Sequence, residues 1–157
     1  MRLRRPEVAA FGSDRSWAFE LSPDELWDRL TDVGGYRQWW PWLARFQPIG
    51  GFQEGARWTC TVTPPLPYDV SFSVLLEQVD PARSVQARVL GDIEGDAHLA
   101  IDAVDGGSVA RLTSQLAPAN PVLRGVGAAA RPLVEWGHDW VLDQGRAQFV
   151  ERGLSAP

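Results

Sequence analysis

The stretch PLVEWGHDWVLDQGRAQFVER, residues Pro132 to Arg152, decides the fold, because no other segment of the chain supports so long a helix. Proline is favoured in the first turn of a helix, and Gly153 suits the position after its end. At about 1.5 Å per residue, the predicted helix spans roughly 30 Å, the width of a small domain. Spacings of three and four residues define one face, which Trp136 and Val141 widen. The positions on this face are Leu133, Gly137, Trp140, Gln144 and Ala147.

The composition indicates one globular domain over residues 1–157, with a core at about 15–152. A net charge of −5 argues against nucleic acid as a partner, because phosphate binding requires a basic patch. Apolar runs are too short for an integral membrane segment, and the arginine-rich start lacks the apolar stretch of a signal peptide. Cys60 is the only cysteine, so an internal disulfide is excluded and a reduced, cytoplasmic compartment is predicted.

The first third of the chain predicts a strand followed by two short helices. Arg15 to Leu21 alternates between apolar and polar residues, as a half-buried strand does. Ser22-Pro23-Asp24-Glu25 then combines a serine cap, an early proline and a glutamate three residues after the cap, which marks a helix start. Gly34-Gly35 ends this helix, and Tyr36 to Leu43 is expected to form a second one, broken by its proline.

From residue 46 the hydrophobic period changes to two, which predicts a series of strands joined by hairpins. Pro64-Pro65-Leu66-Pro67 and Asp105-Gly106-Gly107 are typical of the turns between them. The result is an antiparallel sheet of about seven strands, apolar on one face, which can bury that face by wrapping the long helix. The clearest strands are expected at Arg57–Thr63, Tyr68–Val79, Ser84–Leu90, Glu94–Val104 and Ser108–Leu116.

The segment FELSPDELWDRLTDVGGYRQWWPWL, residues 19–43, resembles the helix-grip proteins of the START and polyketide-cyclase-like (SRPBCC) superfamily. The resemblance covers roughly residues 15–152 and implies an α+β helix-grip fold. In that fold a curved antiparallel sheet surrounds a long C-terminal helix, and two short helices connect the first two strands. The resemblance also implies a deep cavity between sheet and helix. It does not imply a reaction, because members bind lipids and hormones, cyclise polyketides or regulate chaperones.

The expected inward positions of the strands are apolar, apart from Cys60 and Ser114. If these side chains enclose a cavity, we expect the cavity to bind a hydrophobic molecule. The alternative is that the same side chains fill a hydrophobic core without a cavity. The segment Trp39-Trp40-Pro41-Trp42 is expected to form a lid on the sheet or an aromatic rim at the mouth of the cavity. The candidate ligand-binding residues are Trp40, Trp58, Cys60, Phe72, Val74, Val89, Leu99, Leu112, Ser114, Leu133, Trp136, Gly137 and Trp140.

The sequence predicts no catalytic residue, no metal and no cofactor. His98 falls on the outward side of its strand, and His138 at the margin of the buried helix face, so the two histidines do not form a metal site. The strand carboxylates also fall on outward positions, and Cys60 has no evident base beside it. The absence of an inward ionisable residue favours a binder of a small hydrophobic, lipid- or polyketide-like molecule. The alternatives are a polyketide cyclase/dehydratase-type enzyme and a protein-interaction module, whose partner the sequence does not name.

Gly137 lies in the middle of the predicted helix, where glycine costs about 0.5–1 kcal/mol relative to alanine. Two reasons for such a residue are the close approach of a strand backbone and room for a ligand. We expect the second, so that Gly137→Leu folds but no longer binds ligand.

Overall fold

The computed structural model describes residues 11–64, 69–119 and 131–150, and the side chains within residues 12–64, 69–119 and 139–150. The element order is a strand, short helices, a run of strands and a long helix, as predicted. The elements are β1 Phe11–Phe19, α1 Pro23–Leu30, the 3-10 helix η1 Val33–Gly35, α2 Tyr36–Trp39, β2 Leu43–Ile49, β3 Arg57–Val62, β4 Val70–Asp80, β5 Ser84–Gly91, β6 Ile93–Val104, β7 Gly107–Pro118 and α4 Arg131–Gln148.

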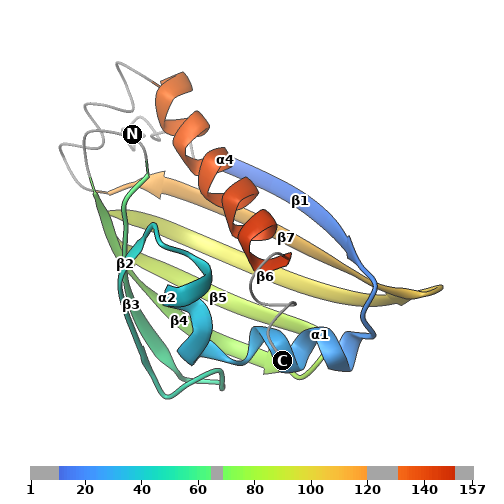
Figure 1. Ribbon diagram of the computed structural model, residues 1–157. Helices are drawn as coiled ribbons and strands as arrows, with labels where there is room; N and C mark the ends of the chain where they lie inside the picture. The colour runs from blue at the N-terminus through green and yellow to red at the C-terminus, as the bar shows by residue number, and fades with distance from the viewer. Residues whose placement is uncertain (1–10, 65–68, 120–130, 151–157) are drawn as a thin grey trace, which may run out of the picture.

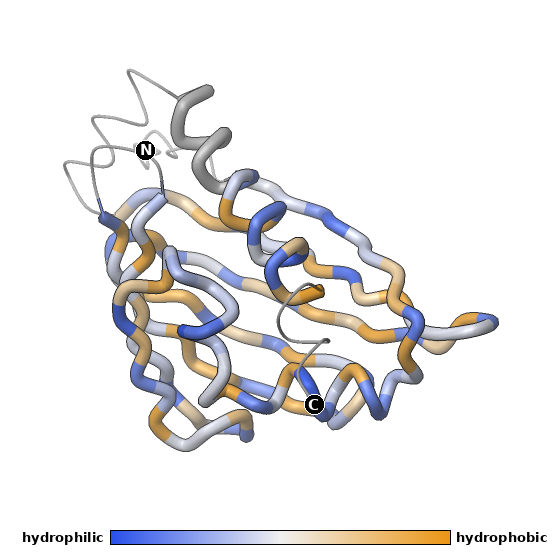
Figure 2. Tube along the Cα trace, viewed as in Figure 1, coloured by the Kyte–Doolittle hydropathy of each residue, from blue (hydrophilic) through white to orange (hydrophobic). Residues whose placement is uncertain are grey.

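Seven strands form one antiparallel sheet in the order β1-β7-β6-β5-β4-β3-β2. The sheet curves, and α4 lies across its concave side, with α1 and α2 on the same side (Figure 1). This is the helix-grip fold. β2 forms one edge of the sheet and contains Pro48, a residue that edge strands tolerate because it has no N–H to donate. Figure 2 shows hydrophobic and hydrophilic residues alternating along the strands, the pattern of a sheet with one covered face.

The predicted helix start is confirmed. The Ser22 hydroxyl accepts a hydrogen bond from the backbone N–H of Glu25 at 3.2 Å, and Pro23 occupies the first turn of α1. α2 ends at Trp39 with Trp40 as its C-cap, immediately before Pro41, as expected from the restriction that proline imposes on the preceding residue. β1 begins four residues earlier than the predicted Arg15, because it pairs with β7 along its whole length from Phe11.

Glycine permits a close approach of two strands at one point of the sheet. Gly95 in β6 has φ +152°, and a Cβ placed on it would lie 1.8 Å from the carbonyl oxygen of Gln115 in β7. No side chain fits in that space, so the tight β6–β7 pairing depends on glycine at this position. The predicted loop at Pro64–Pro67 lies partly outside the described residues.

The helix face predicted from the spacing of Leu133 to Ala147 is wrong at Ala147, while Trp140 and Gln144 on it are half-buried. Ala147 is exposed, and the side chains of residues 131–138 lie outside the described residues. The positions that meet the rest of the protein include Val141, which the prediction placed beside this face, and Gly145 and Phe149, which it left out. The mixture of small and polar residues in α4 left two neighbouring faces almost equally apolar, and only packing distinguishes them.

Candidate ligand-binding cavity

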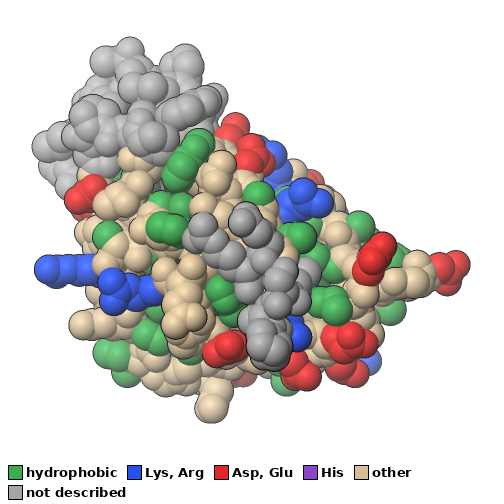
Figure 3. Space-filling model, in the orientation of Figure 1, with side chains coloured by type: hydrophobic (Ala, Val, Ile, Leu, Met, Phe, Trp, Pro, Cys, Tyr) green, Lys and Arg blue, Asp and Glu red, His purple; other side chains and the backbone are tan. Residues whose placement is uncertain are grey.

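An apolar cavity of about 260 Å³ lies between the sheet, α1, the turn after α2, and α4. The sheet and three segments on its concave side therefore contribute to the wall. The lining residues are Trp17, Phe19, Leu26, Leu30, Trp40, Trp42, Leu99, Ala110, Leu112, Val141, Leu142, Gly145, Arg146 and Phe149. On the face of the molecule shown in Figure 3, hydrophobic side chains are visible among polar ones.

The sheet part of the wall comes from three adjacent strands. Leu112 of β7 is paired with Arg15 of β1 on one side and with Leu99 of β6 on the other. One step along the same face, Ala110 is paired with Trp17. The alternation of side chains along a strand places all these positions on one side of the sheet. The small Ala110 is buried and lines the cavity between these larger residues.

The turn after α2 closes one side of the cavity by bonding to α4. The indole N–H of Trp40 donates to the carbonyl oxygen of Gly145 at 2.8 Å, and that of Trp42 donates to Oε1 of Gln148 at 2.9 Å. The two indole rings are stacked, with centroids 5.8 Å apart. Because both polar N–H groups are satisfied by α4, the remaining ring surface is apolar and faces the cavity. Trp40 and Trp42 therefore line the cavity and attach the segment to α4, and an aromatic rim at the mouth stays a prediction.

Gly145 provides space on the helix side of the wall. A Cβ placed on it would lie 3.7 Å from the Trp42 ring and 4.0 Å from Nε1 of Trp40, which is ordinary van der Waals separation. The sequence reasoning missed this residue and chose Gly137, whose surroundings lie outside the described side chains. The signal that identifies Gly145 is its spacing of four residues from both Val141 and Phe149, which defines an apolar stripe through a glycine.

Of the other sequence-predicted residues, the structure brings Trp40, Leu99 and Leu112 to the cavity. Four more pack in the core at β3 and β4 and do not line it: Trp58, Cys60, Phe72 and Val74. Val89 and Ser114 are buried and Trp140 is half-buried, and none of the three is in the wall. The side chains of Leu133, Trp136 and Gly137 lie outside the described residues.

An aromatic cluster packs on the β3–β4 side of the concave face. It consists of Trp27, Tyr36, Trp39, Phe46, Phe52 and Trp58. Tyr36 is at its centre, with ring centroids 5.3 Å from Phe46 and 5.9 Å from Trp58, and its hydroxyl donates to the carbonyl oxygen of Leu30. Large rings at edge-to-face and stacked separations fill this space.

The prediction that no ionisable residue lies on the inward side of a strand is wrong for Arg15. It shares the inner side of β1 with Trp17 and reaches α4, where its guanidinium forms ion pairs with Asp139 at 2.9 Å and Asp143 at 3.1 Å. These pairs attach α4 to the edge of the sheet. All three side chains are at least one-third exposed, so the pairs contribute little to stability.

The Cys60 thiol and the Tyr36 hydroxyl, both buried in the core, stay protonated at neutral pH. Burial raises the pKa of the Cys60 thiol from 9.0 to about 12, so the thiol stays protonated at neutral pH. Burial likewise raises the pKa of Tyr36 well above its ordinary value, and the carboxylate of Asp32 adds to this effect. A protonated thiol is a poor nucleophile, which agrees with the predicted inert role of Cys60.

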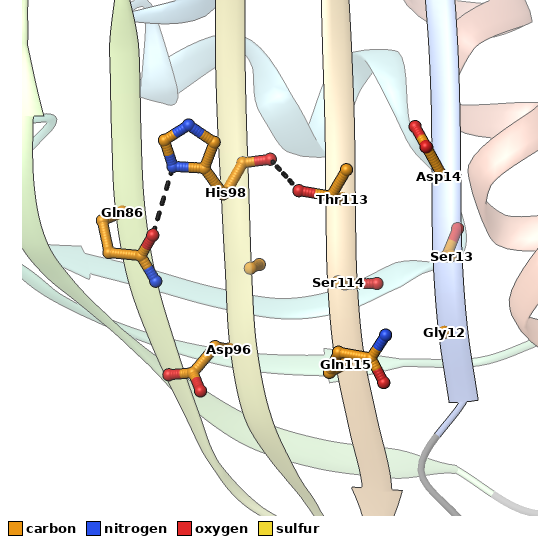
Figure 4. Close-up of a pocket in the computed structure, with 10 residues that line it drawn as sticks. Gly12, Ser13, Asp14, Gln86, Asp96, His98, Thr113, Ser114 and Gln115 are labelled. Carbon is orange, nitrogen blue, oxygen red and sulfur yellow. Dashed lines mark hydrogen bonds between the residues drawn. The ribbon is translucent and has the colours of Figure 1, made fainter.

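A second hollow lies on the outer face of the sheet (Figure 4), and most of the residues that line it are polar. His98 is exposed there, as predicted, and its Nδ1 lies 3.1 Å from Oε1 of Gln86. Asp14 is held by Arg111 through two hydrogen bonds of 2.8 and 2.6 Å, which lowers the pKa of the Asp14 carboxyl. These groups pair with one another across an open surface, so the hollow lacks the apolar enclosure of a ligand site.

The fold and the cavity define a helix-grip protein with an apolar site between sheet and helix. The family model described as "Polyketide cyclase / dehydrase and lipid transport" matches residues 13–149, and the chain belongs to this family. The SRPBCC resemblance seen in the sequence is confirmed. No curated protein matches the sequence. None of the helices in the described residues combines the length and apolar character needed to cross a bilayer.

Solved structures share the fold over nearly the whole chain. TTHA0849 from Thermus thermophilus is 14% identical with a TM-score of 0.78, over 92% of this chain and 98% of that one. The Zhui aromatase/cyclase from Streptomyces sp. R1128 is 17% identical with a TM-score of 0.69, over 94% and 99%. Norcoclaurine synthase from Thalictrum flavum, solved with dopamine and hydroxybenzaldehyde, is 13% identical with a TM-score of 0.62, over 97% and 96%. At these identities the likeness establishes the fold alone.

Proposed function

We propose that the protein binds a small hydrophobic molecule in the cavity between the sheet and α4. The observation that carries the proposal is the composition of the wall: of the fourteen described residues that line it, only Arg146 is charged, and the others are aromatic, aliphatic or glycine. A cavity of this kind gains free energy by removing apolar ligand surface from water, at about 25 cal/mol per Å². The family description, which includes lipid transport, supports the same reading.

The test is uptake of a neutral, environment-sensitive dye such as N-phenyl-1-naphthylamine. We expect saturable binding at one site per chain, with quenching of tryptophan fluorescence, because Trp17, Trp40 and Trp42 lie in the wall. Gly145→Leu should fold normally and lose the dye, since the new side chain extends from the helix into the cavity. The matched control is Ala18→Leu, which adds the same side chain on the exposed outer side of β1. Dye binding only on partial unfolding, or unchanged binding by Gly145→Leu, would contradict the proposal.

A polyketide cyclase/dehydratase-type enzyme is the second candidate, favoured by the family description and by the structural likeness to an aromatase/cyclase. The described lining residues include no histidine, carboxylate or hydroxyl, so such an enzyme would act mainly by positioning a folded chain. Mass spectrometry of a synthetic poly-β-ketone incubated with the protein distinguishes the two. Cyclisation faster than in buffer, and abolished in Gly145→Leu, would favour the enzyme.

Cytoplasmic localisation stays a prediction from the single cysteine.

A further inference from the structure

Among the described residues that line the cavity, Arg146 is the one that carries a charge. It follows Gly145 on α4 and lies one helical turn after Leu142, and both of these residues also line the cavity. The side chain as a whole is exposed, so Arg146 lies where the cavity meets solvent. A guanidinium in this position can contact a ligand inside the cavity while remaining hydrated, which avoids the cost of burying a charge.

The other arginines near this part of the sheet are engaged in ion pairs. Arg15 is bound to Asp139 and Asp143, and Arg111 is bound to Asp14. Within the described part of the chain, Arg146 has no ion pair, although it shares a helix with both acids that hold Arg15. Asp139 and Asp143 are therefore directed to Arg15 of β1, and the donors of Arg146 are left available on the cavity side.

We infer that Arg146 anchors the acidic head of an amphipathic anion whose apolar body occupies the cavity. The inference rests on the proposed function and narrows it from hydrophobic molecules in general to carboxylates. The planar guanidinium binds a carboxylate through two parallel hydrogen bonds, which fixes the orientation of the ligand as well as its charge. The head lies at the exposed end beside Arg146, and the chain extends toward Leu99 and Leu112 on the sheet.

The experiment compares two ligands that share one chain, decanoate and 1-decanol, by displacement of N-phenyl-1-naphthylamine at pH 8. Without an anchor the alcohol should bind more tightly, because a carboxylate loses more hydration on entering an apolar site. With the anchor we expect decanoate to bind about three- to tenfold more tightly than decanol, a range set by the partial exposure of Arg146. The preference should weaken in high salt, which screens an exposed charge pair.

Arg146→Gln should bring the acid-to-alcohol preference to unity or reverse it while decanol still displaces the dye. The matched control is Arg37→Gln, which removes an exposed arginine of α2 that is not in the wall, and should keep the preference. Arg146→Lys should keep part of it, since the charge remains and the paired hydrogen bonds do not.

The outcomes separate the two proposals. If decanol binds as well as decanoate to the wild type, or if Arg146→Gln keeps the preference, the inference about the anion is overturned and hydrophobic binding stands. If neither ligand displaces the dye and the dye itself does not bind, the proposed function fails and the inference with it.

Discussion

The two ends of the concave face of the sheet carry similar apolar residues, but these fill the space at one end and surround a cavity at the other. At β3 and β4, the rings of the aromatic cluster lie 5.1–5.9 Å apart and fill the space. Under α4, at β1, β7 and β6, equally apolar residues surround about 260 Å³ of cavity. The difference lies in what faces the sheet. Tyr36 and Trp39 reach into the first region, whereas the second meets a helix with a glycine at its inner surface.

A pair of identical leucine truncations should separate the two regions most clearly. Leu76 is 2% exposed and packs in the core beside Trp58, so Leu76→Ala should cost about 3–4 kcal/mol of unfolding free energy. Leu112 already faces the cavity, has fewer contacts to lose, and should cost about 1–2 kcal/mol on the same change. Urea titrations of both variants measure the difference. Equal costs would mean that the cavity is closed in solution and that the two regions are packed alike.

Enlarging a glycine in each region tests the same difference in packing by adding atoms instead of removing them. A Cβ on Gly35 would lie 2.7 Å from the Trp39 ring, so Gly35→Ala should overpack the cluster and destabilise the protein by about 1–3 kcal/mol. At Gly145 the added methyl meets nothing closer than 3.7 Å, so Gly145→Ala should stabilise the helix by about 0.5–1 kcal/mol. Melting temperatures should therefore move in opposite directions. A fall for Gly145→Ala would show that the helix lies closer to the tryptophans.

The pH dependence of the unfolding free energy tests whether water is excluded from Cys60 in the filled region at β3. Because burial raises the pKa of Cys60 to about 12 while the unfolded thiol titrates near 9.0, the folded state retains a proton that the unfolded state releases. Stability from this group is complete below pH 9.0 and is lost as the pH rises toward about 12. At pH 10 the expected loss is about 1.4 kcal/mol relative to pH 8.

Cys60→Ala is the control for that measurement, since it removes the thiol and leaves Tyr36 to titrate as before. The difference between wild type and variant across pH 8–10 isolates the thiol. Equal pH profiles, or rapid alkylation of native Cys60 at pH 8, would show that water reaches β3.

The smallest effect is expected on the outer face, which belongs to neither region. His98 is exposed, and its contact with Gln86 is at the surface. His98→Ala should change the unfolding free energy by less than about 0.5 kcal/mol and leave dye affinity unchanged. Isothermal dye titration and urea unfolding of the variant measure both quantities. A larger loss of affinity would place the ligand on the outer hollow instead of under α4.

Local patterns in the sequence determined the elements and the faces of the strands. The serine cap and proline of α1, the proline-limited end of α2, the alternation of β3 to β7 and the outward position of His98 all depend on near neighbours in the chain. Together with the resemblance in residues 19–43, they were enough to predict a sheet around a long helix. The alternation also identified Leu99 and Leu112 as inward-facing positions.

Only the tertiary structure decided which inward residues fill a core and which surround a cavity. Alternation assigns Trp58 and Leu112 to the same face, but it carries no information on how far the opposite layer lies from each. That distance depends on the turn that carries Trp40 and on the rotation of α4, where Gly145 lines the cavity and Ala147 is exposed. Both are set by contacts between residues about a hundred positions apart, such as the hydrogen bond from Trp40 to Gly145. Long-range contacts of this kind have no periodic signature in a single sequence, so the cavity, and Arg146 at its edge, emerged only from the packed molecule.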